Sequence, residues 1–117
     1  MQNYKDLKVW NKAHYFTLQV YKVSEAFPKT ETYGLTNQLR RASSSIAANI
    51  AEGCGKNTKA DFANFLNISL GSANEAEYFV LLAKDLDYLN IESYETLSKL
   101  INEIKAMLIG LILKVRS

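Results

Sequence analysis

The segment 91–115, IESYETLSKLINEIKAMLIGLILKV, decides the fold class of this chain. Its apolar residues recur three and four positions apart, the spacing of a stripe along one side of an α-helix that packs against other helices. The members of this stripe are Tyr94, Leu97, Ile101, Ile104, Leu108, Leu111 and Val115. Asn90 directly precedes the segment, and asparagine is a favourable N-cap. The pattern therefore predicts a long amphipathic helix.

The same periodicity occurs three more times earlier in the chain. We expect helices at about 7–26, 33–53 and 58–89, in addition to 91–115. Pro28 ends the first helix because the residue before a proline is disfavoured in helical geometry. Gly53 and Gly55 end the second helix, and Thr58 caps the third.

Length and composition complete the fold prediction. The chain has 117 residues with one proline and five glycines, a composition that suits one domain, 1–117, of long uninterrupted helices. Short connections favour antiparallel packing of helices that follow one another in the chain. We therefore predict an all-α fold, an antiparallel up-down-up-down four-helix bundle.

Apolar side chains exceed what one bundle can bury. The first predicted helix carries a second apolar line, and the last helix is apolar around much of its end; the extra residues are Leu7, Trp10, Leu18, Tyr21, Met107, Ile109, Ile112 and Leu113. The helix 58–89 also has two apolar faces, which predicts a central position for it. Because large exposed apolar patches mark interaction sites, we expect a homo-oligomer.

Residues that could support catalysis or hold a metal are scarce. His14 is the only histidine, so the Glu-x-x-His pairs of a di-iron bundle are absent, and we expect His14 to be a packed or hydrogen-bonded side chain. Cys54 is the only cysteine, which excludes an intramolecular disulfide, and its position between two glycines could leave it exposed and reactive. We predict no catalytic residue, no metal and no cofactor, and hence no enzyme.

The expected location is cytoplasmic, with no membrane partner. The first residues of the chain carry charge at once and lack the apolar core of a secretory signal. The most apolar run, 107–113, is far shorter than the roughly 20 residues that span a bilayer.

Polar residues form a line on one face of the predicted helix 33–53, with a comparable line on the next helix. The predicted structural polar layer comprises Gln38, Arg41, Ser45, Asn49, Glu52 and Glu75. One interpretation is a hydrogen-bonded layer between the two helices, with Arg41 paired to a carboxylate. The other is a polar groove open to a ligand. Gly71, in a helix interior, costs about 1 kcal/mol relative to alanine, so we expect a close neighbour there.

Charge is distributed unevenly along the chain. Residues 1–60 hold nine Lys or Arg against four acidic residues, whereas the remainder holds five against eight. Such asymmetry permits an anionic partner. The candidate nucleic-acid-binding residues are Lys5, Lys8, Lys12, Lys22, Arg40, Lys56 and Lys59. Trp10 and several tyrosines are available for stacking on bases.

Several short motifs resemble one protein family. They are Asp6-Leu7-Lys8-Val9-Trp10-Asn11-Lys12-Ala13, Phe27-Pro28 with Glu31, Tyr33-Gly34-Leu35-Thr36, Gln38-Leu39-Arg40-Arg41-Ala42, Ser45-Ile46, Asn49-Ile50-Ala51-Glu52-Gly53, Phe65-Leu66, and Gly71-Ser72 with Glu75. Together they resemble the bacterial four-helix-bundle proteins encoded in intervening sequences of 23S rRNA genes, a group also similar to the accessory variability protein of diversity-generating retroelements.

The resemblance implies a bundle that assembles into a ring, expected to be a homopentamer. For the retroelement relatives it further implies a basic surface that binds nucleic acid and a partner reverse transcriptase. We therefore expect a non-enzymatic oligomer that binds the backbone of RNA or DNA through basic residues of the first two helices. The alternative is a protein-interaction scaffold that docks an enzyme such as a reverse transcriptase and makes little contact with nucleic acid.

Overall fold

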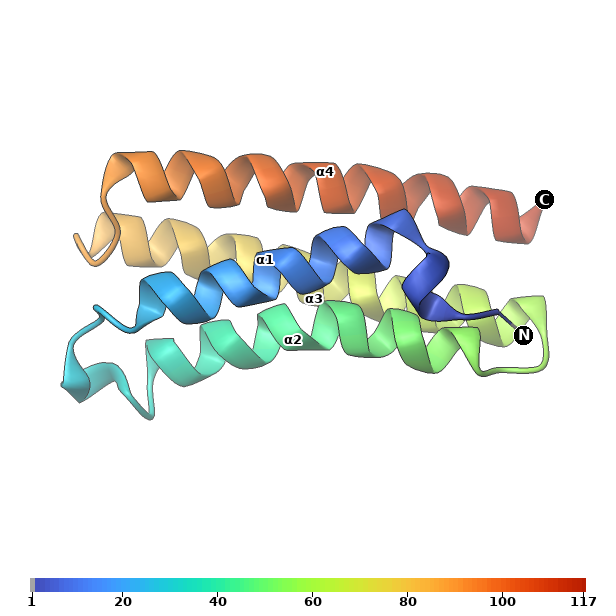
Figure 1. Ribbon diagram of the computed structural model, residues 1–117, viewed down its shortest axis with the longest axis horizontal. Helices are drawn as coiled ribbons and strands as arrows, with labels where there is room; N and C mark the ends of the chain where they lie inside the picture. Colours follow the sequence, from blue (N-terminus) through green and yellow to red (C-terminus); the bar gives the residue numbers. More distant parts are fainter. Residues whose placement is uncertain (1) are drawn as a thin grey trace.

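The computed structural model describes residues 2–117, which form four long helices and two short 3-10 helices (Figure 1). In chain order these are η1 (Tyr4–Asp6), α1 (Lys8–Ser24), η2 (Lys29–Glu31), α2 (Leu35–Cys54), α3 (Lys59–Asp85) and α4 (Ile91–Arg116). None of these helices is long and apolar enough to cross a membrane.

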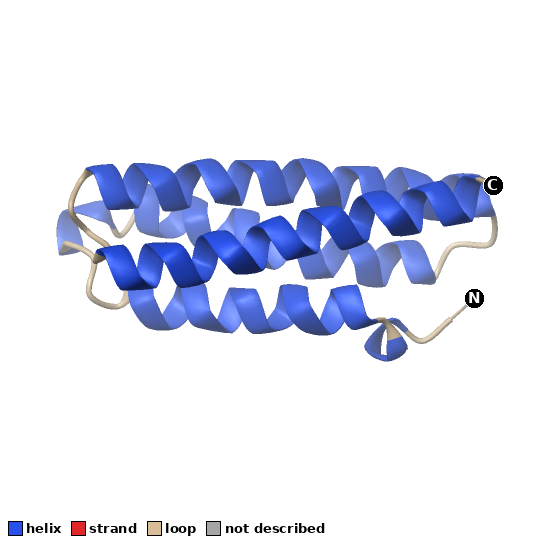
Figure 2. Cartoon of the chain, turned by 90° about the horizontal axis from the view of Figure 1, so that it is seen from above, coloured by secondary structure: helices blue, strands red, loops and turns tan. Residues whose placement is uncertain are grey.

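The four long helices form an antiparallel bundle. Figure 1 shows that each long helix runs opposite to the one before it, and Figure 2 shows the same near-parallel alignment from above. Helix α2 packs against α1 and α3, and α4 packs against α3 and α1, so each helix has two neighbours. The bundle measures 43 × 24 × 20 Å. The predicted all-α, up-down-up-down four-helix bundle is confirmed.

The predicted apolar seams form the core. Phe16 of α1, Leu39 of α2, Leu66 of α3 and Ile104 of α4 are fully buried at its centre. Burying each such side chain contributes about 1.5–3 kcal/mol relative to leaving it in water. The three-four spacing thus correctly indicated which side of each helix faces inward.

Small residues allow α2 and α3 to approach closely. Buried Ala42 and Ser43 on α2, and Ser69, Ala73 and Ala76 on α3, lie in the core of this pair. The Ser69 hydroxyl donates a hydrogen bond of 2.8 Å to the carbonyl of Ile46 on α2. The hydroxyl of Thr17 on α1 similarly donates to the carbonyl of Ser43, at 3.1 Å. Because buried polar groups are costly without partners, these bonds help to fix the register of three helices.

Two helical glycines, Gly53 in the last turn of α2 and Gly71 in the interior of α3, have opposite surroundings. A Cβ atom at Gly53 would lie 2.9 Å from the Cβ of Phe65 and 3.0 Å from Cδ1 of Phe62, so glycine permits the start of α3 to pack on the end of α2. At Gly71 a Cβ would meet no atom within 4 Å. The expected close neighbour of Gly71 is therefore absent from residues 2–117, because its open side faces solvent.

Side chains cap the helix starts as the sequence predicted for α3 and α4. The Asn90 Oδ1 accepts a hydrogen bond from the Ser93 N–H at 2.7 Å, and the Thr58 hydroxyl accepts from the Asp61 N–H at 3.1 Å. Both bonds satisfy backbone N–H groups that have no partner inside the helix.

Glu31 joins the two loops at the end of the bundle opposite the termini. One carboxylate oxygen accepts from the N–H of Leu35, the first residue of α2, at 3.1 Å. The other accepts from the Tyr88 hydroxyl at 2.9 Å, and this bond raises the pKa of Tyr88 above its ordinary value. The Tyr88 ring also packs 5.6 Å from the Phe27 ring, between centroids. The α1–α2 and α3–α4 connections therefore hold each other in place.

The predicted start of the last helix at residue 91 is correct, and the other predicted helix boundaries are wrong by one to four residues. The largest error concerns the helix predicted at 58–89, which ends at Asp85. Asp87 adopts a left-handed conformation with φ 64°, and the Tyr88 N–H bonds to the Ala83 carbonyl at 2.8 Å. This is the hydrogen bond of a Schellman motif, which ends a helix and usually has glycine at the left-handed position.

Several large apolar side chains remain exposed on the outside of the bundle. Leu18 on α1 is 52% exposed and Leu113 on α4 is 65% exposed. The second apolar face of α3 is also only partly covered, with Ile68 51% and Leu86 45% exposed. Helix α3 occupies a corner of the bundle like the other helices, so the prediction that it is central is wrong.

The two helical glycines, Gly53 and Gly71, allow a matched test of packing. Gly53→Ala is expected to lower the free energy of unfolding by about 1–2 kcal/mol, because overpacking costs about 1–3 kcal/mol and the better helix propensity of alanine offsets part of it. Gly71→Ala is the control and is expected to raise the free energy of unfolding by up to about 1 kcal/mol, because alanine has the better helix propensity. Urea denaturation followed by circular dichroism measures both; equal effects would contradict the packing described at Gly53.

The end of α3 provides a second test of stability. Asp87→Gly is expected to raise the free energy of unfolding by about 0.5–1 kcal/mol, because glycine adopts the left-handed conformation without the steric cost of a Cβ. Asp85→Gly removes the same side chain from a helical position and is expected to be neutral within about 0.5 kcal/mol. Thermal unfolding of both variants measures the change in stability. A loss of stability in Asp87→Gly would contradict the left-handed conformation of Asp87.

Candidate nucleic-acid interface

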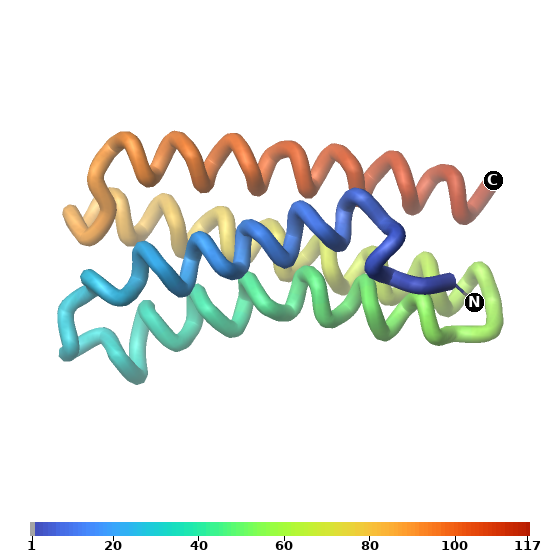
Figure 3. Tube along the Cα trace, viewed as in Figure 1, coloured from blue at the N-terminus to red at the C-terminus, as the bar shows by residue number. Residues whose placement is uncertain are grey.

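Four of the seven candidate basic residues lie at one end of the bundle. Lys5 is in η1, Lys8 begins α1, Lys56 is in the α2–α3 turn and Lys59 begins α3. Figure 3 shows that the N-terminus, the α2–α3 turn and the C-terminus lie at this same end. The antiparallel topology thus gathers residues that are up to 54 positions apart in sequence.

Two basic residues that sequence reasoning missed lie at this end as well. Lys114 and Arg116 are in the last turn of α4. They belong to the second half of the sequence, which is acidic as a whole, so counting the charges of each half did not identify them as part of a basic surface. We define the basic end by these residues: Lys5, Lys8, Lys56, Lys59, Lys114 and Arg116. The sequence did contain a signal for them: an even number of antiparallel helices places both termini at the same end of the bundle, so basic residues near the C-terminus lie close to those near the N-terminus.

Two adjoining cavities bring members of the basic end together. One, of about 250 Å³, is lined by Lys56 and Lys59 together with Gln2 and Phe62. The other, of about 310 Å³, is lined by Lys59 and Arg116, so Lys59 borders both. The backbone N–H of Gln2 donates to the Cys54 carbonyl at 3.4 Å, which attaches the N-terminal segment to the end of α2.

The positive charges of the basic end are largely without counter-charges. Of its members, only Lys56 forms an ion pair among residues 2–117, with Glu52 at 3.9 Å, and this pair is half exposed. A long, exposed pair of this kind contributes little and is screened by salt. The Lys56 ammonium also lies 5.0 Å from the centre of the Phe65 ring. These cations are available to an anionic partner.

The opposite end of the bundle carries the opposite charge. Its acidic residues are Glu25, Glu31, Asp85, Asp87, Glu92 and Glu95. Its basic residues are Lys22, Lys29 and Lys84. The basic end has six basic residues near three acidic ones, Asp6, Glu52 and Asp61. The molecule is therefore polarised along its 43 Å axis although its net charge is only +2. Such a field would orient an approaching polyanion toward the basic end.

The other three candidate basic residues lie away from the basic end. Lys12 is half-buried and pairs with Glu103 of α4 at 3.2 Å. Arg40 connects α2 to α1, where its Nε donates to the Ser24 hydroxyl at 2.8 Å and one terminal nitrogen donates to the Tyr21 carbonyl at 3.3 Å. Lys12 and Arg40 thus have structural contacts within the bundle.

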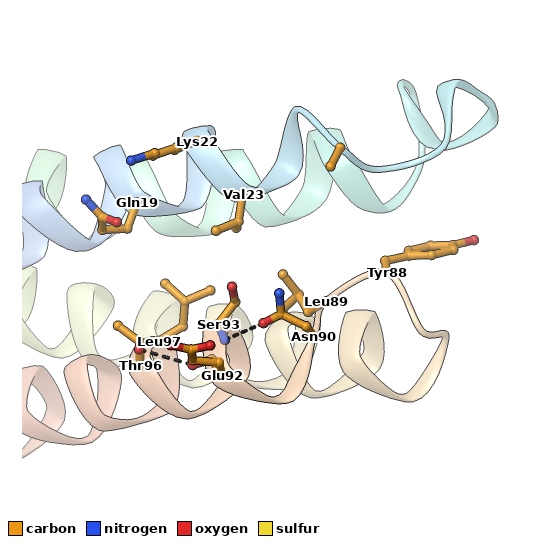
Figure 4. Close-up of a pocket in the computed structure, with 11 residues that line it drawn as sticks. Gln19, Lys22, Val23, Tyr88, Leu89, Asn90, Glu92, Ser93, Thr96 and Leu97 are labelled. Atoms are coloured by element: carbon orange, nitrogen blue, oxygen red, sulfur yellow. Dashed lines mark hydrogen bonds between the residues drawn. The ribbon is translucent and has the colours of Figure 1, made fainter.

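Lys22 lines a cavity of about 480 Å³ between the end of α1 and the start of α4 (Figure 4). The polar groups on the opposite side of the cavity form hydrogen bonds within the first turns of α4. Asn90 accepts from the Ser93 N–H, and the Thr96 hydroxyl donates to the Glu92 carbonyl at 3.1 Å. Figure 4 shows Lys22 and Gln19 along the α1 side of this space. The cavity is at the acidic end, so Lys22 does not extend the basic end.

The line of polar residues on α2 does not form hydrogen bonds across to α3 among residues 2–117. The Asn49 amide donates to the Ser45 carbonyl one turn earlier, at 2.8 Å, and no carboxylate in the described part of the chain lies within 4.0 Å of the Arg41 guanidinium. The expected hydrogen-bonded layer with a paired Arg41 is therefore not present. These side chains are at the solvent edge of the α2–α3 contact, whereas the bond across the contact is made by buried Ser69.

A shallow groove occupies the place of that layer. It measures about 280 Å³, and its lining residues are Gln38, Arg41, Ala42, Ser45, Glu75 and Phe79. The predicted alternative of an open polar groove agrees with this geometry. Glu52, the remaining member of the line on α2, is exposed and pairs with Lys56 instead.

His14 lies on the surface of the bundle, whereas Cys54 is buried. His14 is exposed, and its ring is stacked on Trp10 with 5.0 Å between ring centroids. Cys54 is 3% exposed, so its position between two glycines does not leave the thiol exposed, and burial raises the thiol pKa. Among residues 2–117, no three His, Cys, Asp or Glu side chains gather as metal ligands.

Comparisons with known proteins agree with the observed fold. The family model described as 23S rRNA-intervening sequence protein matches residues 5–110. The chain is also similar to a crystal structure of a protein with unknown function from the S23 ribosomal protein family of Bacteroides thetaiotaomicron. The TM-score is 0.82 and the sequence identity 32%, over 89% of this chain and 94% of the other. No match was found among curated proteins. A match over most of the chain, together with the helical bundle, shows that this protein belongs to the 23S rRNA-intervening sequence protein family.

Proposed function

We propose that this protein is a non-enzymatic, self-assembling helical bundle that binds the phosphate backbone of nucleic acid through its basic end. The observation that carries the proposal is the gathering of Lys5, Lys8, Lys56, Lys59, Lys114 and Arg116 at one end, largely without carboxylate partners. Lysine and arginine side chains bind phosphates with little regard to sequence, and the released counterions make such binding depend on salt. The family name supports RNA as the first polymer to test.

Self-assembly would strengthen this binding. One subunit presents a single basic end with a modest positive charge, which supports only weak affinity. A ring of subunits, expected to be a homopentamer, would present several basic ends to one strand and so raise the effective affinity without new contacts. Exposed apolar side chains on the outside of α4, Ile109 and Leu113, support an interface between copies.

The second candidate function is a scaffold for another protein, such as a reverse transcriptase. The observation that favours it is the apolar outer side of α3, where Ile68, Tyr78, Leu81 and Leu86 are all at least 39% exposed. An apolar surface away from the basic end would suit a protein partner better than a polyanion.

Salt dependence tests nucleic-acid binding directly. The purified protein is expected to bind a mixture of single- and double-stranded RNA at low ionic strength, with an affinity that falls steeply as salt is added. The double variant Lys59→Gln, Arg116→Gln should bind more weakly and reduce the slope of log affinity against log salt by about 2, one for each phosphate contact removed.

The matched control is Lys29→Gln, which removes one exposed lysine from the acidic end and should leave affinity unchanged. Absence of binding at low salt, or equal losses in the control and the basic-end variant, would refute the assignment of the basic end.

Light scattering tests assembly. We expect a mass that is a multiple of the 13.2 kDa subunit, and Leu113→Glu is expected to reduce it by placing a charge in the interface. Tyr33→Ser, at a loop residue that is 94% exposed, is the control and should keep the mass of the parent protein. A monomeric parent protein would exclude the proposed ring.

A further inference from the structure

We propose that the side of α1 facing α2 is a stacking surface for unpaired bases, so that the partner of this protein is a single-stranded nucleic acid. This inference rests on the proposed function, because the basic end would supply the phosphate contacts of the same strand. The stacking surface is defined by Tyr4, Trp10, His14, Leu18, Tyr21 and Arg40.

The aromatic rings of this surface begin at the basic end. The rings of Tyr4 and Trp10 meet edge to face with 4.9 Å between centroids, and the Lys5 ammonium lies 5.9 Å from the Tyr4 ring. His14 then stacks on Trp10 with only 9° between the ring planes. Tyr4 and Trp10 are half-buried against the core, which holds this stack in place, whereas His14 is exposed. A base could therefore extend the stack on the outer side of His14.

A cation and a second ring lie farther along the same side of α1. Tyr21 follows His14 by seven residues, or two helical turns, and therefore projects in nearly the same direction. Tyr21 is 44% exposed, and the centre of its ring lies 4.5 Å from the guanidinium carbon of Arg40. Hydrogen bonds to Ser24 and to the Tyr21 carbonyl fix this guanidinium, and no carboxylate among residues 2–117 pairs with it. The result is a positioned cation beside an exposed ring.

The spacing suits a short strand. Trp10 and Tyr21 are eleven residues apart, about 16 Å along the helix axis at 1.5 Å per residue. Stacked nucleotides rise about 3.4 Å each, so this length corresponds to about five nucleotides. Leu18, 52% exposed, supplies apolar surface between the rings. Proteins that bind single strands combine such aromatic faces with cations that follow the backbone. A duplex keeps its bases paired and stacked on one another, so it could use only the phosphate contacts.

The test compares two variants of exposed residues with a matched control. The probes are 12-nucleotide oligouridine RNA, oligothymidine DNA of the same length, and a 12-base-pair RNA duplex. His14→Ala and Tyr21→Leu are each expected to weaken binding of the single strands about tenfold and to leave duplex binding nearly unchanged. Tyr15→Leu is the control, because Tyr15 is on the same helix and 50% exposed but faces α4 rather than α2. Its affinity for each probe should equal that of the parent protein.

Two further measurements separate stacking from charge. Trp10 is the only tryptophan, so its fluorescence should change when a single strand binds and the base extends the Trp10–His14 stack. The loss of affinity caused by His14→Ala or Tyr21→Leu should be similar at low and moderate salt. The loss caused by the basic-end variant should become smaller as salt screens the charges of the basic end. RNA and DNA single strands should bind within a few-fold of each other, because stacking does not read the 2′-hydroxyl.

The outcomes are distinct. Salt-dependent binding that His14→Ala and Tyr21→Leu do not alter would overturn the stacking surface while leaving the proposed function intact. No binding of any probe at low salt would overturn both. A change in oligomer mass in either variant, with unchanged affinity, would show that this side of α1 is covered by a second copy instead of a strand.

Discussion

The close contact between α2 and α3 is the constraint on which the rest of the bundle depends. Many of their buried residues are alanine or serine, and Gly53 lets the first turns of α3 pass with Phe62 and Phe65 against the end of α2. Protein interiors are packed to nearly crystalline density, so a contact made of small residues permits little sliding. The hydrogen bond from Ser69 to the Ile46 carbonyl adds a directional requirement to this close packing. Once this pair is in register, the positions of α1 and α4 follow from burying their apolar stripes.

That register also decides what meets at each end of the molecule. The α2–α3 turn comes to lie beside both termini, and the two remaining loops meet at the far end, where Glu31 and Tyr88 join them. The same antiparallel topology places most basic side chains of the two ends at one end and most acidic ones at the other. Six basic side chains surround the first end, and six acidic side chains surround the other. A protein with a net charge of only +2 thereby acquires one end with an excess of positive charge.

The proposed function uses the two kinds of surface that the bundle leaves open. The basic end offers cations, of which only Lys56 has a carboxylate partner among residues 2–117, and these suit phosphates. The side of α1 beside it offers exposed rings, which suit bases. The exposed apolar residues of α3, such as Tyr78 and Leu86, lie away from the basic end, whereas Leu113 of α4 is next to Lys114. Both sets remain available to further copies or to another protein. Membership of the 23S rRNA-intervening sequence protein family is consistent with such a binding role but does not specify it, because activity depends on the site and not on the fold.

The sequence by itself determined the fold class, the four helices, their inward faces and their caps at Thr58 and Asn90. These features depend on local periodicity and on side chains within one turn of the backbone they bond. It could not predict the end of α3, because Asp87 takes a conformation that usually requires glycine. It predicted the candidate basic residues only in part. Arg116 lines a cavity with Lys59, Lys114 is in the same last turn of α4, and Lys12 pairs with Glu103, because distances between helices depend on topology and register. Only the tertiary structure decided that Arg41 lies in an open groove, that Cys54 is buried and that His14 stacks on Trp10, since each depends on what the neighbouring segments leave uncovered.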